Sequence, residues 1–192
     1  MTQQVSTDDV NAAVGSENDN KFLTFRLGGE DYGVHILRVR EIIGLMDITA
    51  LPRTPEYVKG VINLRGKIIP VVQLRVRFGL EEIADTESTC IIVVEVQNSE
   101  HDEKHQVGVI VDSVSEVLDI PPGGIEPAPR FASDVDSVYI HGMGKVPGHD
   151  GEPDRVVVLL DLDHILVTTH LKAAASAGES DPSTVQDAAQ AA

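Results

Sequence analysis

The chain has 192 residues and a formal net charge of −16, and 42% of its residues are hydrophobic, which is enough for the core of one ordinary domain or two small ones. The acidic balance argues against nucleic-acid binding, because neutralising phosphates requires clustered Lys and Arg. The single cysteine, Cys90, excludes an intramolecular disulfide framework and a CxxC metal site. No apolar run approaches the ~20 residues of a membrane helix, and the polar N-terminus does not resemble a signal peptide. We therefore expect a cytoplasmic protein without direct membrane insertion.

Both ends of the chain are polar and of low complexity. Residues 1–20 carry four acids and no base, and residues 171–192 consist largely of small and polar types, so we expect two disordered tails. Between them, residues 21–85 carry ten bases and eight acids (net +2), whereas residues 86–170 carry four bases and sixteen acids (net −12). We interpret these segments as two subdomains. Their unequal charge reflects either simple solubility or lobes that meet different partners.

Short strands separated by turn signals fill the first subdomain. Residues 21–27 (KFLTFRL) alternate between apolar and polar types, and the pattern restarts at residues 32–34 and continues as an apolar stretch to residue 43. Residues 53–60 (RTPEYVKG) predict one helical turn, with Thr54 as its N-cap.

The segment KGVINLRGKIIPVVQL, residues 59–74, predicts a β-hairpin. Its two apolar runs are interrupted at Arg65 and Gly66, which places a permanently charged side chain at the tip. The glycine permits a sharp turn.

The second subdomain predicts strands at residues 90–96, 106–111 and 155–162, followed by a short C-terminal helix that begins with Asp161 as its cap. Residues 32–43 (YGVHILRVREII) align with residues 107–118 (VGVIVDSVSEVL) at a constant offset of 75 (107 − 32). Each copy precedes a Pro-containing loop, a Gly-bearing segment and a closing strand. Many short strands, few helices and this repeat predict an all-β fold of two small barrels built on one plan.

No catalytic constellation emerges from the sequence. The spacing of His101 and His105 suits a metal site, but they lie in a polar loop, and the acids of GHDGEPD, residues 148–154, lack the spacing of a calcium loop. Cys90, in an apolar strand, is expected to be an inert thiol. We therefore expect a binding module with no catalytic residue, no metal and no cofactor.

The chain resembles the CheW family of chemotaxis coupling proteins. The resemblance is carried by EDYGVHILRVREII, LPRTPEYVKGVINLRGKIIPVVQLRVRFGL, VGVIVDSVSEVL and IEPAPRF, and it extends from about residue 22 to residue 166. It implies two five-stranded SH3-like barrels in hydrophobic contact. It also implies an adaptor that bridges the cytoplasmic tips of chemoreceptors and the regulatory domain of the histidine kinase CheA.

The resemblance also implies a set of receptor- or kinase-binding positions where the family motifs match: Val39, Glu41, Gly60, Arg65, Gly108 and Val117. Arg65 offers five donors on a planar fork, which suits a carboxylate or backbone carbonyl of a docked receptor tip. Asn63, on the same face of its strand, is expected to brace it, and we add it to the set. An internal pair between Arg65 and Glu41 is a compatible alternative.

Two other functions remain open at this stage. A CheV-like regulator or a detached CheA regulatory domain would share the same motifs. A small acidic metal-dependent hydrolase that uses the Asp and His residues of segment 149–164 belongs to a different class, and a metal assay on chelator-washed protein distinguishes it from an adaptor.

Overall fold

The computed structural model describes residues 19–98, 103–128, 139–148 and 153–166. The predicted disordered tails therefore lie almost wholly outside the described residues, as do His101 and most of the acidic GHDGEPD segment. Strands dominate the described part: β1 (Lys21–Leu27), β2 (Glu30–His35), β3 (Val39–Gly44), β4 (Val58–Leu64), β5 (Lys67–Gln73), β6 (Cys90–Asn98), β7 (Glu103–Val111), β8 (Ser113–Asp119), β9 (Ile125–Glu126), β10 (Ile140–Val146) and β11 (Arg155–Leu160). The helical elements are short: η1 (Ile36–Arg38), α1 (Leu74–Arg77), η2 (Pro122–Gly124) and α3 (Leu162–Leu166).

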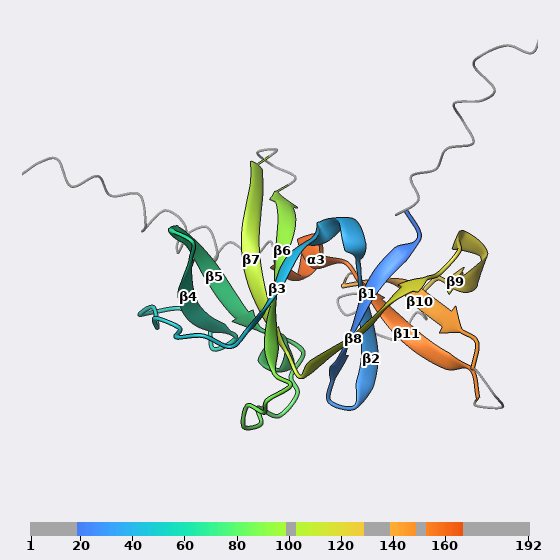
Figure 1. The fold of residues 1–192 in the computed structure, drawn as a ribbon, viewed down its shortest axis with the longest axis horizontal. Helices are drawn as coiled ribbons and strands as arrows, with labels where there is room; N and C mark the ends of the chain where they lie inside the picture. Colours follow the sequence, from blue (N-terminus) through green and yellow to red (C-terminus); the bar gives the residue numbers. More distant parts are fainter. Residues whose placement is uncertain (1–18, 99–102, 129–138, 149–152, 167–192) are drawn as a thin grey trace, which may run out of the picture.

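The strands form two sheets that lie beside each other, with α3 between them (Figure 1). The five-stranded sheet has the order β3-β6-β7-β5-β4, and the six-stranded sheet has the order β8-β1-β2-β11-β10-β9. The all-β class with two SH3-like barrels is confirmed. The sixth strand is the two-residue β9, which pairs with β10.

Each sheet takes strands from both halves of the chain. After β2 the chain crosses at η1 into the five-stranded sheet, and after β7 it crosses back at Asp112 into the six-stranded sheet. The expected boundary between residues 85 and 86 therefore does not separate the two sheets. Strand patterns report which residues are buried, but they do not report which neighbouring strand supplies the hydrogen bonds.

The predicted repeat is visible in strand order, register and irregularities. The order β3-β6-β7-β5-β4 corresponds to β8-β1-β2-β11-β10, and β5 lies parallel to β7 as β11 lies parallel to β2. Ile42 pairs with Ile92 in one sheet, and Val117 pairs with Leu23 in the other. The β3–β6 and β8–β1 pairs carry an irregularity at the same point, as do β4–β5 and β10–β11. The two repeats thus exchange their first hairpins.

Three clusters of buried side chains make up the core. One lies within the five-stranded sheet around Ile62 and Ile91, and one within the six-stranded sheet around Val157 and Leu159. The largest cluster joins residues of both sheets, among them Phe25 of β1 and Val109 of β7. Burying apolar surface contributes about 25 cal/mol per Å², so this shared cluster holds the two sheets together. The expected hydrophobic contact between the barrels is confirmed.

The local predictions had mixed outcomes. The hairpin of β4 and β5 is confirmed, and so is the helix α3, because Asp161 Oδ1 accepts from the His164 amide at 3.1 Å. The helical turn at residues 53–60 is wrong: the Val58 amide donates to the Pro55 carbonyl in a turn, and β4 begins at Val58. Pairing of β4 with β5 requires an extended backbone there, which overrides the local helical signal. Within the described residues, every helix is too short to cross a membrane.

Candidate interaction surface

The exposed pair of Glu41 and Arg65, which we call the anchor pair, lies where the five-stranded sheet is open. Strands β3 and β4 are the two edges of that sheet. Glu41 lies on β3, and Arg65 lies in the turn after β4, from which its Nη2 donates to Glu41 Oε2 at 2.8 Å. The Arg65 side chain is 79% exposed and that of Glu41 is 26% exposed. The pair therefore ties the two edges together while most of the guanidinium remains accessible.

The turn that carries Arg65 has an unusual backbone conformation. Arg65 has φ of +52° and Gly66 has φ of +86°. Positive φ at both central residues of a two-residue hairpin is the type I′ geometry, for which Asn-Gly is the preferred sequence. The Gly66 amide donates to Asn63 Oδ1 at 2.9 Å. Asn63 therefore braces the backbone of the turn, rather than the Arg65 side chain.

Gly60 and Gly108 are buried at close approaches between strands. Gly60 has φ of +141°, and a Cβ there would lie 2.1 Å from the Thr49 carbonyl oxygen. A Cβ on Gly108 would lie 2.9 Å from Cγ2 of Ile91. Both positions therefore require glycine for packing, and neither presents a side chain to a partner.

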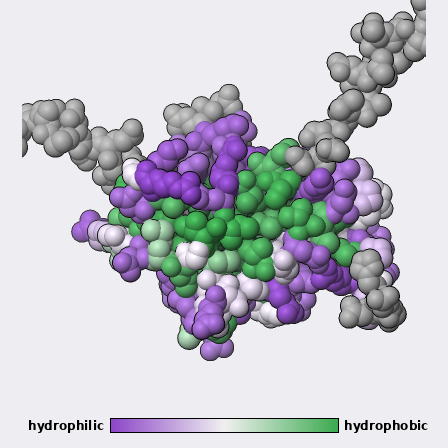
Figure 2. Space-filling model, in the orientation of Figure 1, coloured by the Kyte–Doolittle hydropathy of each residue, from purple (hydrophilic) through white to green (hydrophobic). Residues whose placement is uncertain are grey.

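Apolar side chains are also exposed on β3, η1 and β8. Ile42 follows Glu41 on β3 and is 46% exposed, and Leu37 of η1 is 49% exposed. Val117 of β8, at the position equivalent to Ile42 (42 + 75), is 49% exposed. Val39 is half-buried against the core cluster shared by the two sheets. Figure 2 shows a hydrophobic band across the middle of the molecule, in the region where β3 and β8 lie in Figure 1.

The outer face of the β4–β5 hairpin forms a second exposed surface, which we call the hairpin face. Val61 pairs with Pro70 and Asn63 pairs with Ile68, so these four side chains share one side of the hairpin. Ile68 is 57% exposed, the highest value among the large apolar residues of the described chain. The hairpin face is thus apolar and accessible, next to the turn that holds Arg65.

The structure brings together only part of the predicted set. Glu41, Asn63 and Arg65 meet at the open edge of the five-stranded sheet, and Val117 lies on the other sheet. Ile42, Leu37 and Ile68 were missed because their apolar types indicated burial. The repeat carried a signal for one of them, because Ile42 aligns with the candidate Val117.

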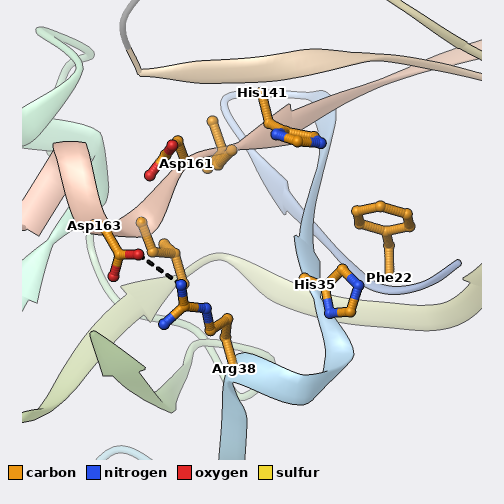
Figure 3. A pocket seen from close by; sticks show the side chains of 8 residues that line it. Phe22, His35, Arg38, His141, Asp161 and Asp163 are labelled. Atoms are coloured by element: carbon orange, nitrogen blue, oxygen red, sulfur yellow. Dashed lines mark hydrogen bonds and ion pairs between the residues drawn. The ribbon is translucent and has the colours of Figure 1, made fainter. Parts of the chain in front are cut away.

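A pocket of about 210 Å³ lies between β1, β2, η1, β10, the end of β11 and α3 (Figure 3). Three of its polar side chains have partners within the protein: Arg38 Nη2 donates to Asp163 Oδ2 at 2.6 Å, and His35 Nε2 lies 2.9 Å from the Asp19 carbonyl oxygen. Burial acts to raise the pKa of Asp161, but hydrogen bonds from the His164 backbone and ring outweigh it and lower the pKa. Polar groups that are paired in this way stabilise the fold.

Other titratable groups serve structural contacts. Burial raises the pKa of the half-buried Cys90 thiol, which keeps it protonated. Glu95 accepts hydrogen bonds from Arg40 and Lys104, and these bonds lower the pKa of its carboxyl group. Within the described ranges, no three His, Cys, Asp or Glu side chains gather in a way that could hold a metal ion. The accessible features are therefore the anchor pair and the apolar surfaces around it.

Comparison with known proteins assigns the family. Residues 21–170 match the family model described as "CheW-like domain". The chain belongs to the CheW family. The chain is 38% identical to the chemotaxis protein CheW of Klebsiella aerogenes over 157 residues, which cover 82% of this chain and 87% of that protein. It is 34% identical to CheW of Rhizobium meliloti over 165 residues, covering 85% of this chain and 99% of that one.

A solved structure supports the same assignment. The scaffolding protein TtCheW of Thermoanaerobacter tengcongensis superimposes with a TM-score of 0.67 at 34% identity, covering 79% of this chain and 95% of TtCheW. This CheW-family chain is accordingly a chemotaxis adaptor.

Proposed function

We propose that this chain couples the cytoplasmic tips of methyl-accepting chemoreceptors to the regulatory domain of CheA, and that it supports the assembly of signalling arrays without catalysis of its own. Membership of the CheW family and similarity to a scaffolding protein support the coupling role. The role requires the protein to work in the cytoplasm beside membrane receptors. The observation that carries the proposal is an exposed guanidinium fixed at an open sheet edge beside exposed apolar side chains.

The receptor tip binds at the anchor pair. Glu41 orients one edge of the Arg65 guanidinium, and the remaining donors are free to bind carboxylates or carbonyls of a helical hairpin. Val39 and Ile42 add apolar contact from β3, and Val117 adds apolar contact from the other sheet. Gly60 and Gly108 contribute indirectly, because they set the spacing of the strands beneath the surface.

The CheA regulatory domain binds at the hairpin face. Ile68 and its neighbours Val61 and Pro70 form an apolar strip on two alternate cross-strand pairs, which share one face of the hairpin. Apolar contact of this kind supplies affinity, while the polar rim supplies orientation. The anchor pair and the hairpin face thus lie on one sheet, which allows one adaptor to hold both partners.

Two substitutions test the assignment of surfaces. Ile68→Ser should weaken binding to CheA at least tenfold and leave receptor binding within about twofold. Arg65→Ala should weaken receptor binding at least tenfold and leave CheA binding within about twofold. The reason is that losing a side chain that anchors an interface costs about 1.4 kcal/mol or more, which is tenfold in affinity. Val156→Ser is the matched control, because Val156 is 50% exposed at the equivalent position of the other sheet. Affinities come from calorimetry with receptor-tip and regulatory-domain fragments. Loss of CheA binding in the control, or no loss in Ile68→Ser, would contradict the proposal.

A further inference from the structure

Two ion pairs lie where the chain crosses between the sheets, and they are built alike. At the crossover after β7, Arg75 donates hydrogen bonds to Asp112 from Nε and from Nη2, each at 2.6 Å. Asp112 Oδ2 also accepts a hydrogen bond from the Gly28 amide at 3.0 Å. At the crossover in η1, Arg38 donates to Asp163 at 2.6 Å, and Asp163 Oδ1 accepts from the Gln97 amide at 2.8 Å (Figure 3). Each pair joins a crossover to the helix that closes a sheet.

The two pairs lie at matching ends of the repeats, with their charges reversed, although the crossover residues are one position apart: at the offset of 75, Arg38 aligns with Ser113 and Asp112 aligns with Leu37. Val71 pairs with Gly108 and Leu159 pairs with Gly33, so the helix residues Arg75 and Asp163 correspond. Likewise Leu23 pairs with Val34 and Ile92 pairs with Val109, so Gly28 and Gln97 correspond. The crossover carries the acid in one pair and the base in the other. We call them the crossover pairs.

The reversed charges determine which repeats can pair with opposite charges in contact. Repeat 1 extends from β1 to α1 (residues 21–77), and repeat 2 extends from β6 to α3 (residues 90–166). If repeat 1 exchanged strands with a second repeat 1, Arg75 would face a crossover that carries Arg38. If repeat 2 did so with a second repeat 2, Asp163 would face a crossover that carries Asp112, next to the position equivalent to Arg38. Only the pairing of unlike repeats places opposite charges together at both crossovers.

The remaining charges follow the same division. Among the described residues, three of the four ion pairs that join the repeats have the base in repeat 1 and the acid in repeat 2: Arg38–Asp163, Arg40–Glu95 and Arg75–Asp112; the fourth, Arg155–Asp31, is longer at 3.7 Å. The segment of repeat 1 is net positive and that of repeat 2 strongly negative. Like charges in contact are destabilising, and such contacts specify partners by disfavouring wrong ones.

We propose that the reversed charges of the crossover pairs make the two repeats complementary to each other and repulsive to themselves, which directs the strand exchange to the unlike repeat of the same chain rather than to a like repeat of a second copy. The partner that this device excludes is therefore another molecule of the same protein. The proposal does not depend on the adaptor function.

The test inverts one crossover pair in the full chain. Arg38→Asp with Asp163→Arg keeps the net charge and the native ion pair, but it makes each repeat complementary to itself. Lys145→Glu with Glu126→Lys is the matched control, because it inverts a pair within repeat 2, whose atoms are 2.7 Å apart. Each variant is unfolded in urea and refolded at a chain concentration on the order of 1 mM, where association between chains competes with pairing within a chain. Light scattering on a sizing column gives the dimer fraction.

We expect the parent and the control to refold as monomers and the Arg38/Asp163 inversion to yield a several-fold larger dimer fraction. Adding Arg75→Asp with Asp112→Arg inverts both crossover pairs and should restore the monomer. If the inverted variant does not refold, Arg38→Gln with Asp163→Asn removes the repulsion without new charges and should still raise the dimer fraction above the control. A dimer fraction equal to that of the control in these variants would overturn the proposal.

Discussion

Replacing Arg65 by Asn separates the two properties of this residue: its left-handed backbone and its contact with Glu41. At φ of +52° the backbone of Arg65 is strained, by about 1 kcal/mol for an ordinary L-residue, and Asn-Gly is the preferred sequence for this turn. Asn should therefore recover most of that strain. Loss of the exposed pair with Glu41, in which the donor and acceptor atoms are 2.8 Å apart, removes about 0.2–1 kcal/mol. The two effects nearly cancel.

We expect the free energy of unfolding of Arg65→Asn to lie within about 0.5 kcal/mol of the parent, whereas Arg65→Ala, which keeps the strain and loses the pair, should lose up to about 1 kcal/mol. Both variants remove the guanidinium, so both should weaken receptor-tip binding by about 1.5–3 kcal/mol, which is tenfold or more. Urea unfolding gives the stabilities and calorimetry gives the affinities. Arg65→Asn that binds as tightly as the parent would refute the role of the anchor pair. Equal destabilisation in both variants would refute the reasoning about the turn.

Three further predictions concern stability and salt. Gly60→Ala should cost more than about 2 kcal/mol of stability, because the position has a positive φ and the added Cβ would clash with backbone. Gly108→Ala should cost less, because the nearest contact of the added Cβ is a side chain. Thermal unfolding that ranks the two variants the other way would contradict this prediction. The hydrogen bond from Arg75 lowers the pKa of Asp112 against the opposing effect of burial. The contribution of ionised Asp112 to folding stability is therefore complete above the unfolded pKa of about 3.9, and it is lost as pH falls through the lower pKa of the folded state. Asp112→Asn should flatten the acid limb of stability measured by urea unfolding from about pH 6 to pH 2. Salt at about 0.5 M should weaken receptor binding through Arg65 but not CheA binding through Ile68, because added salt shortens the Debye length from about 8 Å toward 3 Å and screens only the charged contact. Equal losses of affinity for both partners in calorimetry would argue against separate surfaces.

Interactions between residues close together in the sequence were sufficient to predict several features of the fold. The hairpin tip at Arg65 and Gly66 followed from an interruption of two apolar runs, and the start of α3 followed from Asp161 ahead of an apolar pattern. These features depend on contacts between residues close together in the chain. The repeat could also be read, because residues 32–43 and 107–118 match at a constant offset.

The tertiary structure alone decided the exposure of particular side chains. Ile42 and Ile68 are apolar strand residues like those of the core, yet each is about half exposed because it lies on an outer face of the five-stranded sheet. The helical signal at residues 53–60 failed because β4 begins at Val58 and pairs with β5, which requires an extended backbone. Burial and backbone pairing at these positions depend on neighbours that are distant in the chain.

The exchange of strands was likewise beyond the sequence pattern. Because the two repeats present equivalent strand edges, the hairpin of β1 and β2 has the same alternation of buried residues whether it pairs with strands of its own repeat or of the other. What distinguishes the two arrangements is the set of contacts at the crossovers, such as Arg75 with Asp112 and Arg38 with Asp163. These contacts join residues 37 and 125 positions apart. Their charges are written in the sequence, but only the folded chain shows which of them meet, because pairing depends on distance in space rather than on order along the chain.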